Sequence, residues 1–182
     1  MPVQQTSMCV IANNRITVNG QTVFEQAADS DFAAFAKAAF KNLNLAYPKF
    51  YKMDRLCKLG FLAAEYLLSG NMACRPDEST AIVLCNSSGS LDSDLTHLQN
   101  AEQPSPAVFV YTLPNIVAGE IAIRHGIKGE TAFFISERDG DPAVRQYVAG
   151  MLESGAAGSC IAGWVDYADE QYLARLYFAE YG

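Results

Sequence analysis

Few side chains in this sequence have both the type and the spacing that chemistry requires. Asp92, Asp94 and His97 bring two carboxylates and an imidazole into one polar segment, which could hold a metal ion, although a surface loop has the same composition. His125 closes a predicted helix, where a cation interacts well with the helix dipole, so a structural role is the simplest interpretation. Ser136 has no base near it in the sequence, which a nucleophilic serine needs. We therefore expect a surface loop at 92–97 and a structural serine at the end of a strand.

The serine-rich turn and the cysteines could in principle be reactive, but their spacing does not support a catalytic or metal-binding role. The serine-rich turn at residues 86–90 matches neither the GxSxG nucleophile elbow nor a phosphate-binding loop, so we interpret it as a strand-to-loop turn. The cysteines are odd in number, form no CxxC pair and do not cluster with histidine. Such thiols behave as small hydrophobic side chains, which predicts a reduced, cytoplasmic protein without a metal or cofactor. They are Cys9, Cys57, Cys74, Cys85 and Cys160.

The composition excludes several classes of function. Half of the 182 residues are hydrophobic and 18% are charged, which is ordinary for a globular domain, and we expect residues 1–182 to form one domain. The net charge of −7, without a cluster of lysine and arginine, argues against nucleic-acid binding. No apolar run is long enough for a membrane span, and the N-terminus does not have the pattern of a signal peptide.

Hydrophobic periodicity indicates the elements that must position these side chains. Apolar residues at helical spacing predict helices over 32–42, 54–68, 114–125 and 141–154. Apolar runs predict strands over 80–85, 131–136, 159–165 and 171–179, after a short N-terminal strand or hairpin. Strands that alternate with helices predict an α/β fold with a largely parallel sheet and an antiparallel last strand.

Residues 115–166 resemble the middle of the N-terminal half of a β-ketoacyl synthase, a condensing enzyme of the thiolase fold. Without a gap, they match that family's helix, Gly-Leu-Lys-Gly turn, strand, nucleophile elbow, helix and Ala-Gly-Gly-containing strand. Shorter stretches agree with the same family, namely 52–55, 81–84, 105–106 and 172–179. The resemblance covers about residues 50–182 and is weakest over the N-terminal 50 residues.

The resemblance implies a fold class in more detail. It implies an α/β, thiolase-like N-terminal half, with a mixed, mostly parallel five-stranded sheet and helices on both faces. The family's second half supplies two histidines that stabilise the enolate and a lysine that orients them. Because the sequence ends where that half would begin, we expect no self-contained condensation from this chain.

The most reactive position of the family is replaced here. Ser136, Glu137 and Arg138 occupy the place of the usual Thr-Ala-Cys, so Arg138 takes the position of the nucleophilic cysteine. A guanidinium remains protonated and is not a nucleophile, so we expect no catalytic residue. Arg138 has two interpretations: a solvated residue at a helix start, paired with Glu137 or Asp139, or a residue that fills the former acyl pocket or reaches a partner subunit.

The resemblance also implies partners. The family dimerises through the strand before the nucleophile, which here offers Thr131, Phe133, Phe134 and Ile135. A short, apolar, uncharged edge would aggregate if left bare, so we expect a homodimer or a heterodimer with an active ketosynthase. An acyl carrier protein is a further partner that the family implies, although the net charge of −7 means that it would need a local basic patch.

Three functions are compatible with this pattern. The first is a catalytically inactive ketosynthase-like subunit, comparable to a chain-length factor, in fatty-acid or polyketide-type biosynthesis. The second is a split 3-oxoacyl-ACP synthase or acyl-transfer enzyme that a second chain completes. The third is a module that binds an acyl chain in the vacated pocket.

Overall fold

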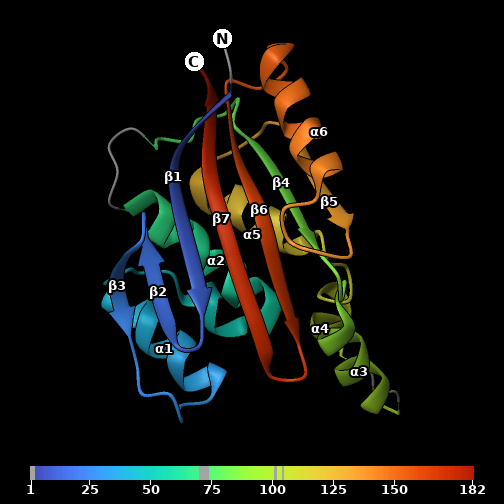
Figure 1. The fold of residues 1–182 in the computed structure, drawn as a ribbon. Coiled ribbons are helices and arrows are strands. Elements are labelled where there is room, and N and C mark those ends of the chain that lie inside the picture. The colour runs from blue at the N-terminus through green and yellow to red at the C-terminus, as the bar shows by residue number, and fades with distance from the viewer. Residues whose placement is uncertain (1–2, 70–73, 101, 104) are drawn as a thin grey trace.

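The computed structural model describes residues 3–69, 74–100, 102–103 and 105–182. Within them, seven strands form one sheet in the order β3-β2-β1-β7-β6-β4-β5 (Figure 1). The strands are β1 (Val3–Ala12), β2 (Arg15–Val18), β3 (Gln21–Glu25), β4 (Ala81–Asn86), β5 (Thr131–Ile135), β6 (Ser159–Ala168) and β7 (Gln171–Tyr181). The helices are α1 (Phe32–Asn42), η1 (Pro48–Lys52), α2 (Arg55–Ser69), α3 (Leu91–Gln99), α4 (Pro106–Val110), α5 (Ile116–His125) and α6 (Pro142–Glu153).

The predicted α/β class is confirmed, but the mostly parallel five-stranded sheet is wrong. Only two pairings are parallel, those of β4 with β5 and with β6, whereas the other four pairings are antiparallel. The difference arises in the first 25 residues, because Asn13 and Asn14 both adopt positive φ and close a tight hairpin between β1 and β2. The chain continues from this hairpin into β3, and β1 pairs with β7. The N-terminal strands therefore join the sheet formed by the later strands.

A second correction concerns the polar segment after β4. Residues 92–97, predicted to be a surface loop, lie in helix α3. The helix is favoured by Asp92 and Asp94 in its first turn, where carboxylates interact well with the helix dipole. Arg55 of α2 fixes it to the rest of the chain by donating to Asp92 at 3.0 Å. The segment is therefore an ordered helix held by an ion pair.

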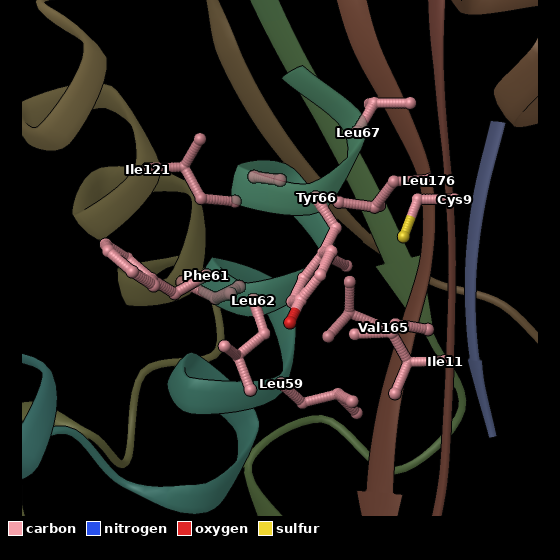
Figure 2. Close-up of a cluster of buried hydrophobic side chains, with 14 of the residues drawn as sticks. Cys9, Ile11, Leu59, Phe61, Leu62, Tyr66, Leu67, Ile121, Val165 and Leu176 are labelled. Carbon is pink, nitrogen blue, oxygen red and sulfur yellow. The ribbon is translucent and has the colours of Figure 1, made fainter. Parts of the chain in front are cut away.

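One face of the sheet carries the larger core. Helices α1, α2 and α5 lie behind the sheet in Figure 1, and α2 lies between the strands and α5. Figure 2 shows side chains of α2, among them Leu62 and Leu67, packed between Ile121 of α5 and Leu176 of β7. The apolar residues of α2 are buried nearly all round, as expected of a helix enclosed on both sides.

The other face carries α6 alone among the described elements (Figure 1). Val144, Val148 and Leu152 of α6 pack on strands β4 and β6, where they form a second, smaller core with Trp164. Helices therefore lie on both faces, as predicted, but the two layers differ greatly in extent. No helix in the described part of the chain is long and apolar enough to cross a membrane.

Candidate functional site: the β5–α6 turn and its groove

The turn between β5 and α6 lies where the parallel strands end. The backbone N–H of Ser136 donates to the carbonyl of Asn86 at 2.8 Å, which extends the β4–β5 pairing by one residue. Asp141 caps α6 by accepting from the N–H of Ala143 at 2.8 Å, and Pro142 occupies the first helical position. The turn is therefore fixed at both ends.

Ser136 is buried and forms a hydrogen bond within this turn. Its hydroxyl donates to Asp141 at 2.6 Å. This hydrogen bond, together with that from Ala143, holds the pKa of the Asp141 carboxyl below its usual value. A carboxylate whose protonation is disfavoured is a weak general base, so the geometry supports the structural interpretation of Ser136.

Both histidines pack against other partners. His125 lies 3.4 Å from Glu65 of α2, on the face of the sheet opposite to α6. His97 lies in the last turn of α3, with its ring 5.5 Å from the ring of Phe109. Among the described residues, no group of three or more histidine, cysteine or acidic side chains could hold a metal ion.

Arg138 lies in a bend four residues before Pro142, and its side chain is exposed. Residues 137–140 form a turn before α6 begins, so Arg138 precedes the helix, and its exposure is compatible with the interpretation of a solvated residue. Arg138 is also absent from the residues that line the adjacent groove. The alternative that it reaches a partner subunit is compatible with its exposure.

The groove beside this turn runs between α6 and the sheet and has a volume of about 720 Å³. Its walls are mostly apolar, with side chains from α6 on one side and from β1 and β7 on the other. The lining residues are Val3, Gln5, Met8, Val10, Cys85, Asp139, Gly140, Asp141, Val144, Arg145, Val148, Ala149, Gly163, Arg175, Tyr177 and Ala179.

Two arginines that sequence reasoning missed lie at one end of the groove. Arg175 of β7 forms an ion pair with Asp139 in the turn. Arg145, in the first turn of α6, passes close to Gly140, where an added Cβ would lie 2.4 Å from its Nη2 atom. The sequence offered only a weak signal, a cation near the start of a helix, because the two arginines are 30 positions apart along the chain.

Cys85 is the thiol that lines the groove. Its Sγ donates to the carbonyl of Gly163 at 3.5 Å. Burial, assisted by the nearby Asp139 and Asp141 carboxylates, raises the pKa of Cys85 to about 11. The thiol is protonated at neutral pH, which makes it a poor nucleophile. All five cysteines are buried and free, in agreement with their interpretation as small hydrophobic side chains.

The predicted dimer strand β5 is an edge of the sheet. It pairs with β4 on one side, and in the described chain no strand pairs with its other side. Thr131 is exposed, Phe133 and Phe134 are partly buried, and Ile135 is 64% exposed.

A patch of exposed apolar side chains lies on α3 and α4, beyond the end of β5. An added Cβ at Gly89, just before α3, would lie 3.7 Å from Ile135, so the patch begins beside the edge strand. We call these residues the apolar end surface: Leu91, Leu95, Leu98, Phe109, Val110, Leu113 and Ile135.

Asp54, in the stretch that resembles the family's Met-Asp-Arg helix, serves as a helix cap. It accepts from the N–H of Cys57 at 2.8 Å and from the Ser93 hydroxyl at 2.6 Å. Burial raises the pKa of Asp54, although these hydrogen bonds favour the ionised form. Its role is to join the start of α2 to α3.

Comparison with known proteins identifies the fold. No protein-family model matches the chain, and no curated protein is similar to it in sequence. The whole chain superposes on 63% of a chain of the ishigamide ketosynthase/chain length factor, with a TM-score of 0.75 and 19% identity. It also superposes on 80% of a chain of a ketosynthase in complex with its chain length factor from Xenorhabdus doucetiae (TM-score 0.67, 15% identity).

A β-ketoacyl synthase from Burkholderia phymatum gives the same result, with a TM-score of 0.64, 13% identity and 59% of that chain covered. The predicted thiolase-like fold is thus confirmed. The chain spans less than two thirds of the length of the ishigamide chain. At these identities the likeness concerns the fold, and the roles of individual residues depend on the geometry described above.

Proposed function

We propose that the chain is a catalytically inactive, chain-length-factor-like subunit that pairs with an active ketosynthase in fatty-acid or polyketide-type biosynthesis. The observation that carries this proposal is the β5–α6 turn, where the residue aligned with the family's nucleophilic cysteine is the exposed Arg138. We further propose that the pair works in the cytoplasm, where five buried, free thiols would remain reduced.

The chemistry of the turn supports an inactive subunit. Acyl transfer through a covalent intermediate needs an activated nucleophile with a base beside it. The Ser136 hydroxyl donates a hydrogen bond to Asp141 at 2.6 Å, and the carboxylate also accepts from the N–H of Ala143 in α6. Cys85 is buried, with its pKa raised to about 11. Neither group is prepared to accept an acyl chain at neutral pH.

The edge of the sheet at β5 has features that favour the binding of a protein partner. Strand β5 leaves one side of its backbone unpaired by any described strand, and the apolar end surface continues from it over α3 and α4. Exposed apolar patches next to an open edge strand favour association, because burial of both removes apolar area and backbone groups from water. We propose that a ketosynthase covers this edge.

Co-expression with a ketosynthase from the same gene neighbourhood tests the pairing. We expect the two chains to co-elute in size-exclusion chromatography and Ile135→Lys to abolish co-elution, because it places a charge on the edge strand. Ile123→Lys on α5 is the matched control, since Ile123 is 67% exposed and Ile135 is 64% exposed. Separate elution of the unmodified chains, or equal behaviour of the two variants, contradicts the proposal.

Acyl labelling distinguishes this proposal from a split enzyme or an acyl-transfer enzyme. The purified pair is incubated with a radiolabelled acyl thioester, and each chain is analysed for a covalent adduct. We expect the label on the ketosynthase and none on this chain. An adduct on this chain that is lost in Ser136→Ala or Cys85→Ser would show that it takes part in the chemistry.

A further inference from the structure

Helices α3 and α4 lie together beyond one end of the sheet (Figure 1) and have no apolar core of their own. Between Cys85 and Val117, none of the described residues belongs to the buried hydrophobic side chains of the molecule. Ser93 is the single buried residue of α3, and no residue of α4 is buried. The elements before and after them, β4 and α5, both pack in the main core. Because burial of apolar area is the main favourable term in folding, other contacts must hold these two helices in place.

Two polar contacts connect α3 to the start of α2. The Ser93 hydroxyl donates a hydrogen bond to Asp54 at 2.6 Å, and Arg55 donates to Asp92 at 3.0 Å. We call this pair of contacts the latch. The Arg55 side chain is 45% exposed, and a solvent-exposed ion pair adds little to stability. The latch therefore holds α3 much less firmly than several buried apolar side chains would.

The two helices are also connected to each other, so that they can move together. The Ser90 hydroxyl, directly before α3, donates to the carbonyl of Thr112, two residues after α4, at 2.7 Å. The ring of His97 in α3 lies 5.5 Å from the ring of Phe109 in α4. The segment thus has ends that meet and parts that pack on one another, which are the properties of compact surface loops.

We propose that α3 and α4 form an arm that opens from the body of the molecule as one unit when the latch breaks, and that the closed arm completes the apolar end surface. Five of the seven residues of that surface lie on the arm, whereas Ile135 lies on β5. The surface is therefore continuous only when the arm is closed, and opening interrupts it. This inference goes beyond the pairing with a ketosynthase, and it concerns the chain without any partner.

The space between the arm and the body favours such an opening. A cleft of about 240 Å³ lies there, with Asp54 and Arg55 on the side of α2 and Ser93 and Val108 on the side of the arm. Closely packed elements leave no space of this size between them. Opening therefore breaks few apolar contacts and gives solvent access to Ser93, which is buried while the arm is closed.

Hydrogen exchange of the full chain at increasing low urea concentrations tests whether the arm opens as a unit. We expect the amides of α3 and α4 to share one opening equilibrium, at least about a hundredfold more populated than the opening of β4 and α5. Helix α6 is the matched element, since it is also a surface helix but is anchored by four buried apolar residues, and its exchange should be slower than that of α3. Exchange of the arm only through global unfolding, or separate openings of α3 and α4, would overturn the proposal.

A pair of charge variants tests the latch in the same exchange measurement. Arg55→Gln removes the ion pair with Asp92 and should speed the exchange of the arm by about threefold. Lys128→Gln is the matched control, because it removes the cation of another exposed ion pair, with Glu78, and should leave the arm unchanged. An unchanged arm in Arg55→Gln would show that the latch does not hold it, which contradicts the proposal.

Thiol labelling tests solvent access beneath the arm. Ser93→Cys and Ser159→Cys place a thiol at two buried serines, which are 4% and 6% exposed. A thiol reagent should modify Ser93→Cys at least about a hundredfold faster than Ser159→Cys, because only the first site becomes accessible when the arm opens. The native cysteines are all buried and serve as markers of global unfolding. Equal rates for the two variants would overturn the proposal.

Discussion

The two faces of the sheet differ in how completely helices cover them. On one face α2 is enclosed between the strands and α5, and nearly all of its side chains are buried. On the other face α6 covers part of the sheet and leaves a groove of about 720 Å³ along β1 and β7. The first face therefore carries the main core of the fold, whereas the second combines a smaller core with an open groove.

The difference lies in the helices themselves. α2 has buried residues at almost every position from Leu56 to Leu67, which leaves it no wet side. α6 buries Val144, Val148, Met151 and Leu152 at helical spacing and exposes Arg145 and Tyr147 between them. An amphipathic helix can stay folded while one side faces water or a ligand, so binding on this face need not disturb the core.

The largest difference in stability is expected when valine is replaced by alanine on each of the two faces. Val117→Ala on α5 should destabilise the fold by about 3 kcal/mol, because its site is fully buried and a cavity would remain. Val144→Ala on α6 should cost about 1 kcal/mol, since it borders the open groove and leaves no closed cavity. Urea denaturation of both variants measures the difference, and equal losses would contradict the contrast between the faces.

A glycine inside the closed face should show how tightly it is packed. An added Cβ at Gly60 of α2 would lie 2.3 Å from a methyl of Val117, so Gly60→Ala should destabilise the fold by about 2 kcal/mol through overpacking. Combined with Val117→Ala, it should cost less than the sum of the two single changes, because the removed methyls make room for the new one. Simple additivity in thermal or urea denaturation would show that the two sites do not share this space.

The buried carboxylate of the closed face makes its stability depend on pH. Burial raises the pKa of Glu65, but the nearby His125 side chain and the hydrogen bond from Arg124 outweigh burial, so the net pKa is below its usual value. A lowered pKa stabilises the fold at pH values above the pKa of unfolded glutamate and loses this contribution as pH falls through the folded pKa. Glu65→Gln should therefore cost about 2 kcal/mol at pH 7, and the difference from the unmodified chain should shrink below about pH 4.

Denaturant titrations at several pH values check this expectation. Lys58→Gln is a useful control, because Lys58 lies on the same helix and burial lowers its pKa against the opposing effect of Asp54. A constant difference between Glu65→Gln and the unmodified chain from pH 7 to pH 3 would show that the ionised carboxylate is not what stabilises this cluster.

The smallest change in stability is expected for a glycine-to-alanine substitution on α6, which should stabilise the fold where the same substitution at Gly60 destabilises it. Around Gly150 no described atom lies within 4 Å of an added Cβ. Gly150→Ala should thus stabilise the fold by about 1 kcal/mol, because alanine has the higher helix propensity and meets no neighbour. A decrease in the thermal midpoint would indicate that something already packs against this side of α6 in solution.

Much of the fold could be predicted from the sequence. The helix at 32–42 agrees with α1 at both ends, because Asp31 caps it by accepting from the N–H of Ala34. The strand at 131–136 and the helix at 141–154 each agree with the structure to within a residue at either end. These elements carry their own signals, namely caps, apolar periodicity and continuous apolar runs.

The errors arose where the partner of a segment decides its structure. The local sequence pattern of the N-terminal hairpin is the same for a separate hairpin and for one that joins the sheet. Only its pairing with β7 shows that it extends the sheet to seven strands. The charged segment at 92–97 has few apolar residues, and its helical form depends on contacts such as that between Arg55 and Asp92. Neither contact can be read from local periodicity.

The candidate site divides in the same way. The apolar edge strand could be read from the sequence, and the proposal that Arg138 takes the place of the family's cysteine rests on the sequence as well. The groove could not, because it is formed by residues of β1, β7 and α6 that are far apart along the chain. Sequence reasoning therefore examined Arg138, whereas Arg145 and Arg175 are the arginines that line a cavity.

By itself, the sequence determined which segments are helices and strands and which reactive side chains this turn lacks, because caps, periodicity and residue identity are local properties. The tertiary structure decided that one face is closed and the other open, and which side chains line the groove between α6 and the sheet. Those properties depend on strand order and on the ion pair between Arg175 and Asp139, two residues that meet only after the sheet has formed.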